Sequence, residues 1–384
     1  MTDQVMIVAG EASGDLHGAR LVDSMRNRRP ELHFCGIGGP ELRTRGVELL
    51  YDASKIAVVG FFEVARHLSD IVKAQKILRR RLVESPPGLL ILIDFPDFNL
   101  LLARKAKRLG IPVFYYISPQ VWAWRSGRVR TIGRLADAIG VILPFEEQFY
   151  RQRGVTAEYV GHPLLDSVRA IYARAEFCRI HQLDAEVQLI GIMPGSRSRE
   201  IAALFPVFLE AALRYQEMSD ERPTFLIPLA PTVKEQTLYQ HGLSAYGPKL
   251  EFSVISEDRY SLMAACDAVM AASGTATLEL ALLDTPALVA YKLAPLTYQL
   301  GKLLVDIRYF SLVNLIAGEA VVLELLQHQA TPEAIAGELQ RLIADDTRRK
   351  KVFSGYLKVR QALGQSGASQ RAADLVLRVM ERNS

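Results

Sequence analysis

Apolar residues along this chain fall into short runs, and each run is followed by a glycine or polar turn and then by a helical pattern. In the first half the runs lie at residues 5–9, 33–37, 89–93, 113–117, 139–143 and 157–160. In the second half they lie at 189–193, 224–229, 251–254, 268–271 and 287–291. Helical spacing between them is clearest at 16–28, 100–109, 201–218 and 275–283. This alternation predicts βαβ units and parallel sheets that helices cover on both faces.

The series stops and restarts once, which predicts two domains. Gly161-His162-Pro163 ends the first series, and the seam lies within 162–186, where a polar helical stretch leads to the next run. After Pro332 only helical spacing follows, and residues 368–381 carry one apolar helical face, made of Ala372, Leu375, Val376 and Val379. The predicted fold class is α/β, with two Rossmann-like doubly wound domains facing a cleft. Ligands of such folds bind at the carboxyl ends of the strands.

Composition narrows the class of protein. The 384 residues suffice for two α/β domains, and 49% hydrophobic with 23% charged residues is typical of a globular chain. A formal charge of +4 is too small to indicate nucleic acid as a partner. The isolated Cys35, Cys178 and Cys266 predict neither a disulfide framework nor a zinc site, and a reducing compartment fits. The sequence predicts no signal peptide and no membrane span, and hence a soluble or peripheral protein.

Two loops after strands of the second domain have the composition of phosphate sites. PGSRSRE (residues 194–200) opens a helix, whose free N–H groups attract phosphate; Gly195 allows close approach and Arg197 can donate two hydrogen bonds. In ASGTATLE (272–279), hydroxyl groups precede a helix, and Glu279 suits ribose hydroxyls. Capped helix starts, one with surface arginines, explain the same residues without a ligand. Together the two loops indicate a nucleotide diphosphate, and the absence of GxxxxGK[ST] and GxGxxG disfavours an ATPase or a dehydrogenase.

The first domain carries polar residues after its first and third strands. GEASGD (residues 10–15) has more polar side chains than a capped turn needs, although Ser13 is a plausible N-cap. Asp94 directly follows the run 89–93, where burial would raise its pKa and make it a general base. Asp97 is an alternative base, or a cap of the next helix, and Glu11 and His162 also remain open. His17 is a further candidate, although a lone histidine is more often structural.

Aromatic residues are concentrated in one segment, and metal-binding motifs are absent from the sequence. SPQVWAWR (residues 118–125) holds both tryptophans of the chain, whose rings either stack on a sugar or fill the core. There is no DxD motif and no HxxxH pair, so neither a metal nor a cofactor is predicted.

The motifs together resemble the lipid A disaccharide synthases over nearly the whole chain. The segments that carry the resemblance are VAGEASGD (8–15), IDFPDFN (93–99), SPQVWAWR (118–125), LPFE (143–146), GHP (161–163), PGSR (194–197), ASGTATLE (272–279) and SLVNLIAG (311–318). The resemblance implies an inverting, metal-independent glycosyltransferase of the two-Rossmann (GT-B) type. Such enzymes join UDP-2,3-diacylglucosamine to 2,3-diacylglucosamine 1-phosphate (lipid X), giving a β(1→6) disaccharide 1-phosphate and UDP. It also implies a cytoplasmic protein held peripherally at the inner membrane.

The resemblance assigns roles to the residues found above. Asp94 is expected to be the catalytic base. The residues expected to bind substrate are Glu11, Ser13, Asp15, Asp97, Trp124 and Arg125. Those expected to bind UDP are Gly195, Ser196, Arg197, Ser273, Gly274, Thr275, Glu279 and Asn314. The expected domains are 1–165, 166–350 and C-terminal helices at 351–384, which cross back onto an N-terminal domain and can be exchanged in a homodimer.

Two other functions fit parts of the pattern. The same architecture serves other UDP-sugar enzymes, such as a 2-epimerase or another lipid glycosyltransferase. A non-catalytic nucleotide-binding or membrane scaffold module is the alternative from a different class, although it would not need Asp94 and Arg197.

The segment 55–81 suits an anionic membrane surface. Its helical apolar stripe is flanked by further apolar residues, and it carries a net charge of +5 from seven basic and two acidic side chains. The expected membrane contacts are Val58, Val59, Phe61, Phe62 and Arg66. An ordinary helix with a solvated basic face is the alternative.

Overall fold

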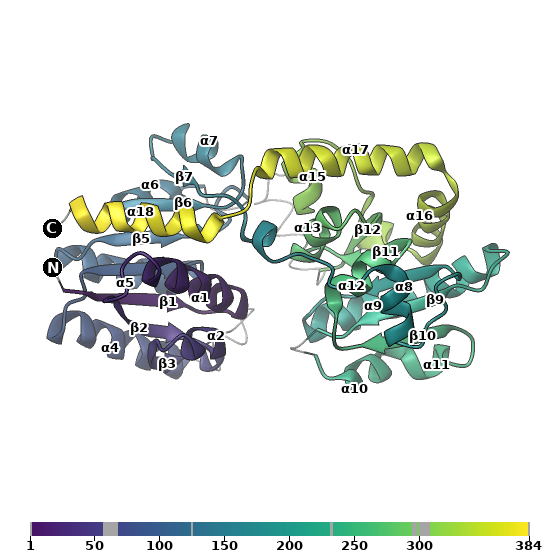
Figure 1. The fold of residues 1–384 in the computed structure, drawn as a ribbon, viewed down its shortest axis with the longest axis horizontal. Helices are drawn as coiled ribbons and strands as arrows, with labels where there is room; N and C mark the ends of the chain where they lie inside the picture. Colours follow the sequence, from purple (N-terminus) through teal and green to yellow (C-terminus); the bar gives the residue numbers. More distant parts are fainter. Residues whose placement is uncertain are drawn as a thin grey trace. The chain divides into compact units, whose positions relative to one another are not determined.

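The computed structural model describes residues 2–56, 68–123, 126–230, 233–293, 298 and 308–382. The chain forms two compact units. Unit 1 comprises Met1–Asp166 and Gln365–Ser384, and unit 2 comprises Ser167–Gly364 (Figure 1). Each unit is built around one parallel sheet with helices on its faces.

The sheet of unit 1 has the strand order β3-β2-β1-β4-β5-β6-β7. Its strands are β1 (Gln4–Ala9), β2 (His33–Gly38), β3 (Glu48–Asp52), β4 (Leu89–Ile93), β5 (Val113–Tyr116), β6 (Ala138–Val141) and β7 (Glu158–Tyr159). The α-helices among the described residues of this unit are α1 (Ala12–Arg26), α2 (Pro40–Thr44), α4 (Leu68–Glu84), α5 (Pro96–Arg108), α6 (Arg128–Leu135), α7 (Glu146–Arg151) and α18 (Ala368–Arg382). Because side chains alternate along each strand, one face packs under α1 and α18 and the other under α4, α5 and α6.

The sheet of unit 2 has the order β10-β9-β8-β11-β12-β13. Its strands are β8 (Leu189–Met193), β9 (Thr224–Pro228), β10 (Glu251–Ile255), β11 (Ala268–Ala272), β12 (Ala287–Tyr291) and β13 (Glu324–Leu326). The helices include α8 (Arg174–Ile180), α9 (Ser198–Met218), α10 (Glu235–Leu238), α11 (Ser244–Tyr246), α12 (Arg259–Ala265), α13 (Thr275–Leu282), α15 (Leu312–Ala317), α16 (Pro332–Ala344) and α17 (Asp346–Leu363).

Two strands were not predicted. Glu48–Asp52 is only partly buried, and Glu324–Leu326 is three residues long, so neither has the continuous apolar run of a central strand. Both lie at sheet edges, where one neighbouring strand is missing.

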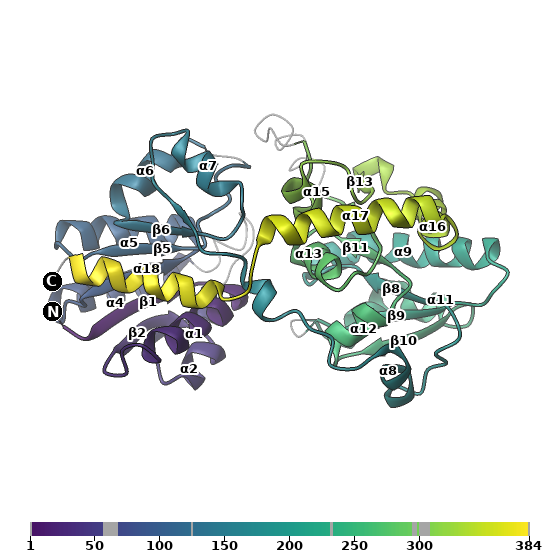
Figure 2. The same ribbon diagram turned by 45° about the horizontal axis from the view of Figure 1, so that its top comes forward.

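The C-terminal helix returns to unit 1. In Figures 1 and 2, α18 lies along unit 1. Its apolar residues share one core cluster with those of α1, and its Val376 is fully buried there. Arg371 adds a polar anchor, since its Nε donates to the carbonyl of Val160 at 2.9 Å. The predicted start of this crossing at 351 is too early, because α17 belongs to unit 2 and the crossing begins at Gln365. The reason is that α17 buries its own apolar face against α15 and α13.

Candidate active site

In each unit, the strand order brings together two loops that are far apart in the sequence. In unit 1 the order reverses between β1 and β4, and in unit 2 it reverses between β8 and β11. Connections leave opposite faces of the sheet at such a switch point, which opens a crevice at the carboxyl ends of the two strands. The loops at these ends are 10–11 and 94–95 in unit 1, and 194–197 and 273–274 in unit 2. All four loops were singled out from the sequence.

Asp94 is held in an unusual backbone conformation. Both Asp94 and Phe95 have φ of 44°, in the left-handed region that non-glycine residues seldom adopt. The Asp94 carbonyl accepts hydrogen bonds from Tyr115 Oη at 2.7 Å and from Asn99 Nδ2 at 2.8 Å. A Cβ at Gly10 would lie 2.6 Å from the Phe95 ring, so only glycine fits beneath this turn. The surroundings thus fix a strained turn, which is a feature of functional sites.

The surroundings of the Asp94 carboxyl group raise its pKa and so make its carboxylate more basic. Burial, and then the negative charge of Glu11, raise its pKa from 3.8 to about 6, while the Phe95 backbone N–H partly opposes them. Glu11 is itself the N-cap residue of α1 and lies at the end of the neighbouring strand. A carboxylate with a pKa near 6 is ionised at neutral pH and is a stronger base than an ordinary aspartate.

The other acidic candidates of unit 1 have structural partners. Asp15 is 2% exposed, and its carboxylate accepts the backbone N–H groups of Gly39, Glu41 and Leu42 at 2.7, 2.9 and 3.2 Å. It therefore fixes the start of α2. Asp97 lies in the first turn of α5, where it forms an ion pair with Arg128 and does not cap the helix.

The structure also describes Ser13 and the two histidine candidates. Ser13 is exposed in the first turn of α1 and is not the N-cap, which is Glu11. Burial lowers the pKa of His17 to about 4 and that of His162 to about 3. The His162 Nδ1 accepts from the backbone N–H of Leu164 at 3.2 Å. Both rings are neutral at pH 7 and too weakly basic to compete with Asp94.

The loop after β5 brings aromatic residues near this site. Its Trp122 packs edge-on against Phe145 with ring centroids 5.1 Å apart, and its indole donates to Glu146 Oε1 at 3.1 Å. Glu146 belongs to the LPFE motif and was not predicted as a site residue. In the sequence this glutamate follows the apolar residues 141–145 and precedes a second glutamate, and no motif assigned a buried partner to it. Trp124 and Arg125 lie outside the described residues.

The PGSR loop of unit 2 forms the N-terminus of α9. Gly195 has φ of 114°, which a glycine adopts without strain, and Arg197 is the N-cap residue, with its side chain 52% exposed. The Glu200 carboxylate accepts from the backbone N–H of Ser196 at 3.3 Å and from Arg197 at 3.0 Å. A carboxylate from the same helix thus engages the donors that an incoming phosphate would use.

The second phosphate-type loop lies beside the first one across β8 and β11. Gly274 is the N-cap residue of α13, and both Gly274 and Thr275 are exposed. The Ser273 hydroxyl donates to the carbonyl of Phe310 at 3.2 Å, which ties this loop to the segment before α15. No side chain caps α13, so the alternative of a capped helix start does not hold for this loop.

Glu279 is buried within unit 2. It forms an ion pair with Arg259, and the Tyr260 hydroxyl donates to it at 3.4 Å. Burial raises its pKa, and the Arg259 charge partly opposes this effect. A ribose would have to share this carboxylate with Arg259.

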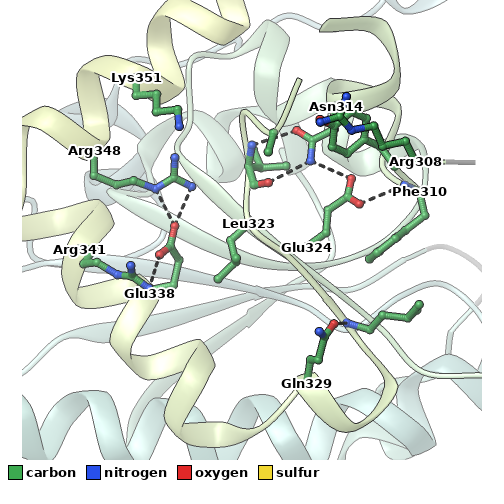
Figure 3. A pocket seen from close by; sticks show the side chains of 14 residues that line it. Arg308, Phe310, Asn314, Leu323, Glu324, Gln329, Glu338, Arg341, Arg348 and Lys351 are labelled. Carbon is green, nitrogen blue, oxygen red and sulfur yellow. Dashed lines mark hydrogen bonds and ion pairs between the residues drawn. The ribbon is translucent and has the colours of Figure 1, made fainter. Parts of the chain in front are cut away.

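Asn314 organises the loop around α15 (Figure 3). Its amide nitrogen donates to the Val322 carbonyl at 2.9 Å and to Glu324 Oε1 at 2.8 Å, and its amide oxygen accepts from the N–H groups of Val321 and Val322 at 2.9 and 3.0 Å. The amide is fully used by the protein itself. A cavity of about 650 Å³ lies beside it, lined on one side by Arg341, Arg348 and Lys351.

The predicted membrane contacts Val58, Val59, Phe61, Phe62 and Arg66 lie outside the described residues. Immediately after them, α4 begins with Leu68 and Val72, which are 55% and 59% exposed on one side of the helix. Within the described residues no helix is long and apolar enough to span a bilayer. The same described residues contain no cluster of three or more metal-ligating side chains.

Relatives with known names share this sequence and its fold. Residues 5–379 match the family model described as lipid-A-disaccharide synthetase. The lipid-A-disaccharide synthase of Geobacter metallireducens is 47% identical over 379 residues, which cover 98% of this chain and 97% of that protein. That of Coxiella burnetii is 39% identical over 376 residues, covering 97% of each.

Solved structures confirm the predicted fold class. UDP-GlcNAc 2-epimerase from Neisseria meningitidis has a TM-score of 0.66 at 12% identity, covering 99% of this chain and 100% of that one. MurG from Acinetobacter baumannii has a TM-score of 0.59 at 16% identity, covering 98% and 99%. At these identities the likeness shows the fold alone. The match to the family model over nearly the whole chain, with relatives at 39% and 47% identity, shows that this chain belongs to the lipid-A-disaccharide synthase family of glycosyltransferases.

Proposed function

We propose that the chain transfers the diacylglucosamine group of UDP-2,3-diacylglucosamine to the 6-hydroxyl of 2,3-diacylglucosamine 1-phosphate, with inversion at the anomeric carbon. The new C1–O6 bond forms as the bond from C1 to the UDP oxygen breaks, and the O6 proton passes to a base. The products are the β(1→6) disaccharide 1-phosphate and UDP. The family membership supports lipid A disaccharide synthesis, and the residues below support an inverting displacement of UDP.

The observation that carries the proposal is the environment of Asp94. An inverting displacement needs one base beside the acceptor hydroxyl, and Asp94 combines a position at the switch point with a pKa raised to about 6. Its turn is fixed by Tyr115, Asn99 and Gly10, so the carboxylate does not need to reorganise when substrate binds.

The departing UDP needs positive charge and hydrogen-bond donors. The N–H of Ser196, the guanidinium of Arg197 and the N-terminus of α9 provide these, and the Ser273–Thr275 loop provides hydroxyl groups. For the diphosphate to bind there, Glu200 must release Ser196 and Arg197. We assign Gly195 and Gly274 to the close approach of backbone and phosphate. Glu279 and Asn314 act chiefly by holding their loops in shape.

The direct test supplies the purified protein with UDP-2,3-diacylglucosamine and lipid X, and follows the disaccharide 1-phosphate and UDP by mass spectrometry. The proposal expects both products in equal amounts, with the β anomer seen by NMR. UDP released without disaccharide, or an epimerised sugar nucleotide, would refute it. The variant Asp94→Asn is the matched negative control.

We further propose that the protein lies peripherally on the cytoplasmic face of the inner membrane. Diacylated sugars remain in a bilayer, so the enzyme must reach them there. The segment 55–81 has a net charge of +5, and within its described residues the start of α4 exposes Leu68 and Val72.

Liposome co-sedimentation tests this location. Replacing Val59, Phe62, Arg79 and Arg80 by serine is expected to reduce binding, and more so for vesicles with anionic lipid, because each basic residue near such a surface adds about 1 kcal/mol. UDP affinity should stay unchanged. Equal sedimentation of the variant and the wild type would exclude this segment as the membrane contact.

A further inference from the structure

Glu146, at the first residue of α7, is a buried carboxylate surrounded by hydrogen-bond donors. It is 2% exposed. Its Oε1 accepts from the Trp122 indole at 3.1 Å, and its Oε2 accepts from the backbone N–H groups of Ile142 and Leu143 at 3.2 and 2.9 Å. A single side chain therefore joins the loop after β6 to the loop after β5.

Only the ionised form satisfies all three donors. A protonated carboxyl, or the amide of a glutamine, would direct an N–H or O–H at one of them and leave a buried donor without an acceptor. The backbone pair offers two hydrogen bonds and the indole only one. The oxygen facing Trp122 is therefore the one that would be lost.

The proton equilibrium of Glu146 lies in the physiological range. Burial raises its pKa to about 7, and the three hydrogen bonds oppose this. The charged or titratable groups that act on it or respond to it are Asp94 after β4, Tyr150 on α7 and Tyr159 on β7. Asp94 titrates at lower pH, so its negative charge is already present and disfavours ionisation of Glu146.

A second tie joins α7 to the same loop. The Tyr150 hydroxyl is hydrogen-bonded to the Ser118 hydroxyl, so 118–123 is attached to α7 near both ends. The loop leaves β5, whose Tyr115 is hydrogen-bonded to the carbonyl of Asp94 at 2.7 Å. The position of Trp122 and the position of the proposed base are thus set by one connected group of residues.

We propose that Glu146 is a positioning residue, whose carboxylate holds Trp122 and the 118–123 loop in place beside Asp94 for binding of the acceptor sugar. The acceptor part rests on the proposed function above. Glu146→Gln imitates the protonated form, and it is expected to raise the KM for the acceptor about tenfold, with a smaller change in kcat and an unchanged UDP affinity.

Fluorescence tests the hydrogen bond between Glu146 and Trp122 without any substrate. Trp122 and Trp124 are the two tryptophans of the chain, so Trp124→Phe leaves Trp122 as the sole reporter. Its emission is expected to change in one step with a midpoint near pH 7. The step should vanish in Trp124→Phe/Glu146→Gln, whose emission at pH 8.5 should equal that of the single variant at pH 5.5. Circular dichroism at each pH checks that the fold is retained.

The neighbouring glutamate offers a matched control. Glu147 lies on the same turn of α7 but forms a surface ion pair with Arg151. Trp124→Phe/Glu147→Gln should keep the full fluorescence step, and Glu147→Gln should keep the wild-type KM. Emission that does not change between pH 5.5 and 8.5, or a step that survives Glu146→Gln, would overturn the proposal.

A second variant, Trp122→Phe, tests the same proposal by kinetics if Glu146→Gln does not fold. Trp122→Phe keeps a smaller aromatic ring for packing against Phe145 and removes the indole N–H donor. It should raise the acceptor KM as Glu146→Gln does, and the double variant should be no worse than either single one. If the effects of the two substitutions on the acceptor KM were additive, the proposal that Glu146 acts through Trp122 would be overturned. If the wild type forms no disaccharide, the proposed function fails, and the fluorescence step still decides the role of Glu146.

Discussion

Replacing Asp94 by asparagine should remove the proposed base and at the same time stabilise the fold at alkaline pH. Asparagine is the suitable replacement, because it tolerates the left-handed φ of 44° far better than alanine does. The hydrogen bonds from Tyr115 and Asn99 go to the backbone carbonyl of residue 94, so they survive the change.

The size of the stabilisation follows from the pKa of Asp94. The pKa is raised from 3.8 to about 6, so the folded chain holds this proton more tightly than the unfolded chain does. Stability therefore falls as pH rises from about 4 to about 6, and the full penalty persists above that range. At about 1.36 kcal/mol per pKa unit, the penalty is on the order of 3 kcal/mol. An asparagine side chain at this position carries no charge and escapes the penalty.

Urea unfolding at two pH values measures this difference. At pH 8, Asp94→Asn is expected to exceed the wild type in free energy of unfolding by roughly 1–3 kcal/mol, and at pH 3.5 the difference should almost disappear. Asp97→Asn, three residues along and exposed, is the control; it should lie within about 0.5 kcal/mol of the wild type at pH 8. An Asp94→Asn protein that is no more stable at pH 8, or a gain that is equal at both pH values, would refute the electrostatic reasoning.

Activity provides the complementary measurement. Asp94→Asn should lower kcat at least about 100-fold, since general-base assistance is typically worth about 10²–10⁴. In the wild type, kcat/KM should rise with pH through about 6, where the base loses its proton. Activity of the variant within a factor of ten of the wild type would exclude Asp94 as the base.

Three further predictions concern UDP, metals and assembly. Arg197→Ala should weaken UDP binding by roughly 1.5–3 kcal/mol in calorimetry, whereas Glu200→Gln should strengthen it, because its carboxylate competes for the same donors; an unchanged affinity in Arg197→Ala would place the diphosphate elsewhere. Activity should survive exhaustive EDTA treatment, since the sequence has no DxD motif, and a loss that Mg²⁺ or Mn²⁺ restores would contradict this. Sedimentation at micromolar concentration should show a homodimer, with α18 able to exchange between subunits, and a monomer alone would count against it.

Several features of the site were predictable because they depend on local order in the chain. Asp94 follows a run of apolar residues and must lie at a strand end, and Pro194–Arg197 must precede a helix. Helix starts were less accurate: α1, α5 and α9 begin three or four residues earlier than their apolar spacing indicates. The first turn of a helix at a strand end is polar and lies outside the apolar stripe, so periodicity does not detect it.

The sequence by itself determined the α/β class, the two series of strands and the loops in which the chemistry lies, because each of these follows from the period of apolar residues and from motifs a few residues long. The tertiary structure decided which polar side chains of those loops already have hydrogen-bond partners within the protein. The carboxylate of Asp15 holds the start of α2, and the side-chain amide of Asn314 is fully hydrogen-bonded within its own loop. Glu146 is brought into contact with Trp122. These outcomes depend on partners 7 to 27 positions away in the chain. Hydrogen-bond partners and burial at such separations are set by the packing of elements against one another, and no local pattern contains them.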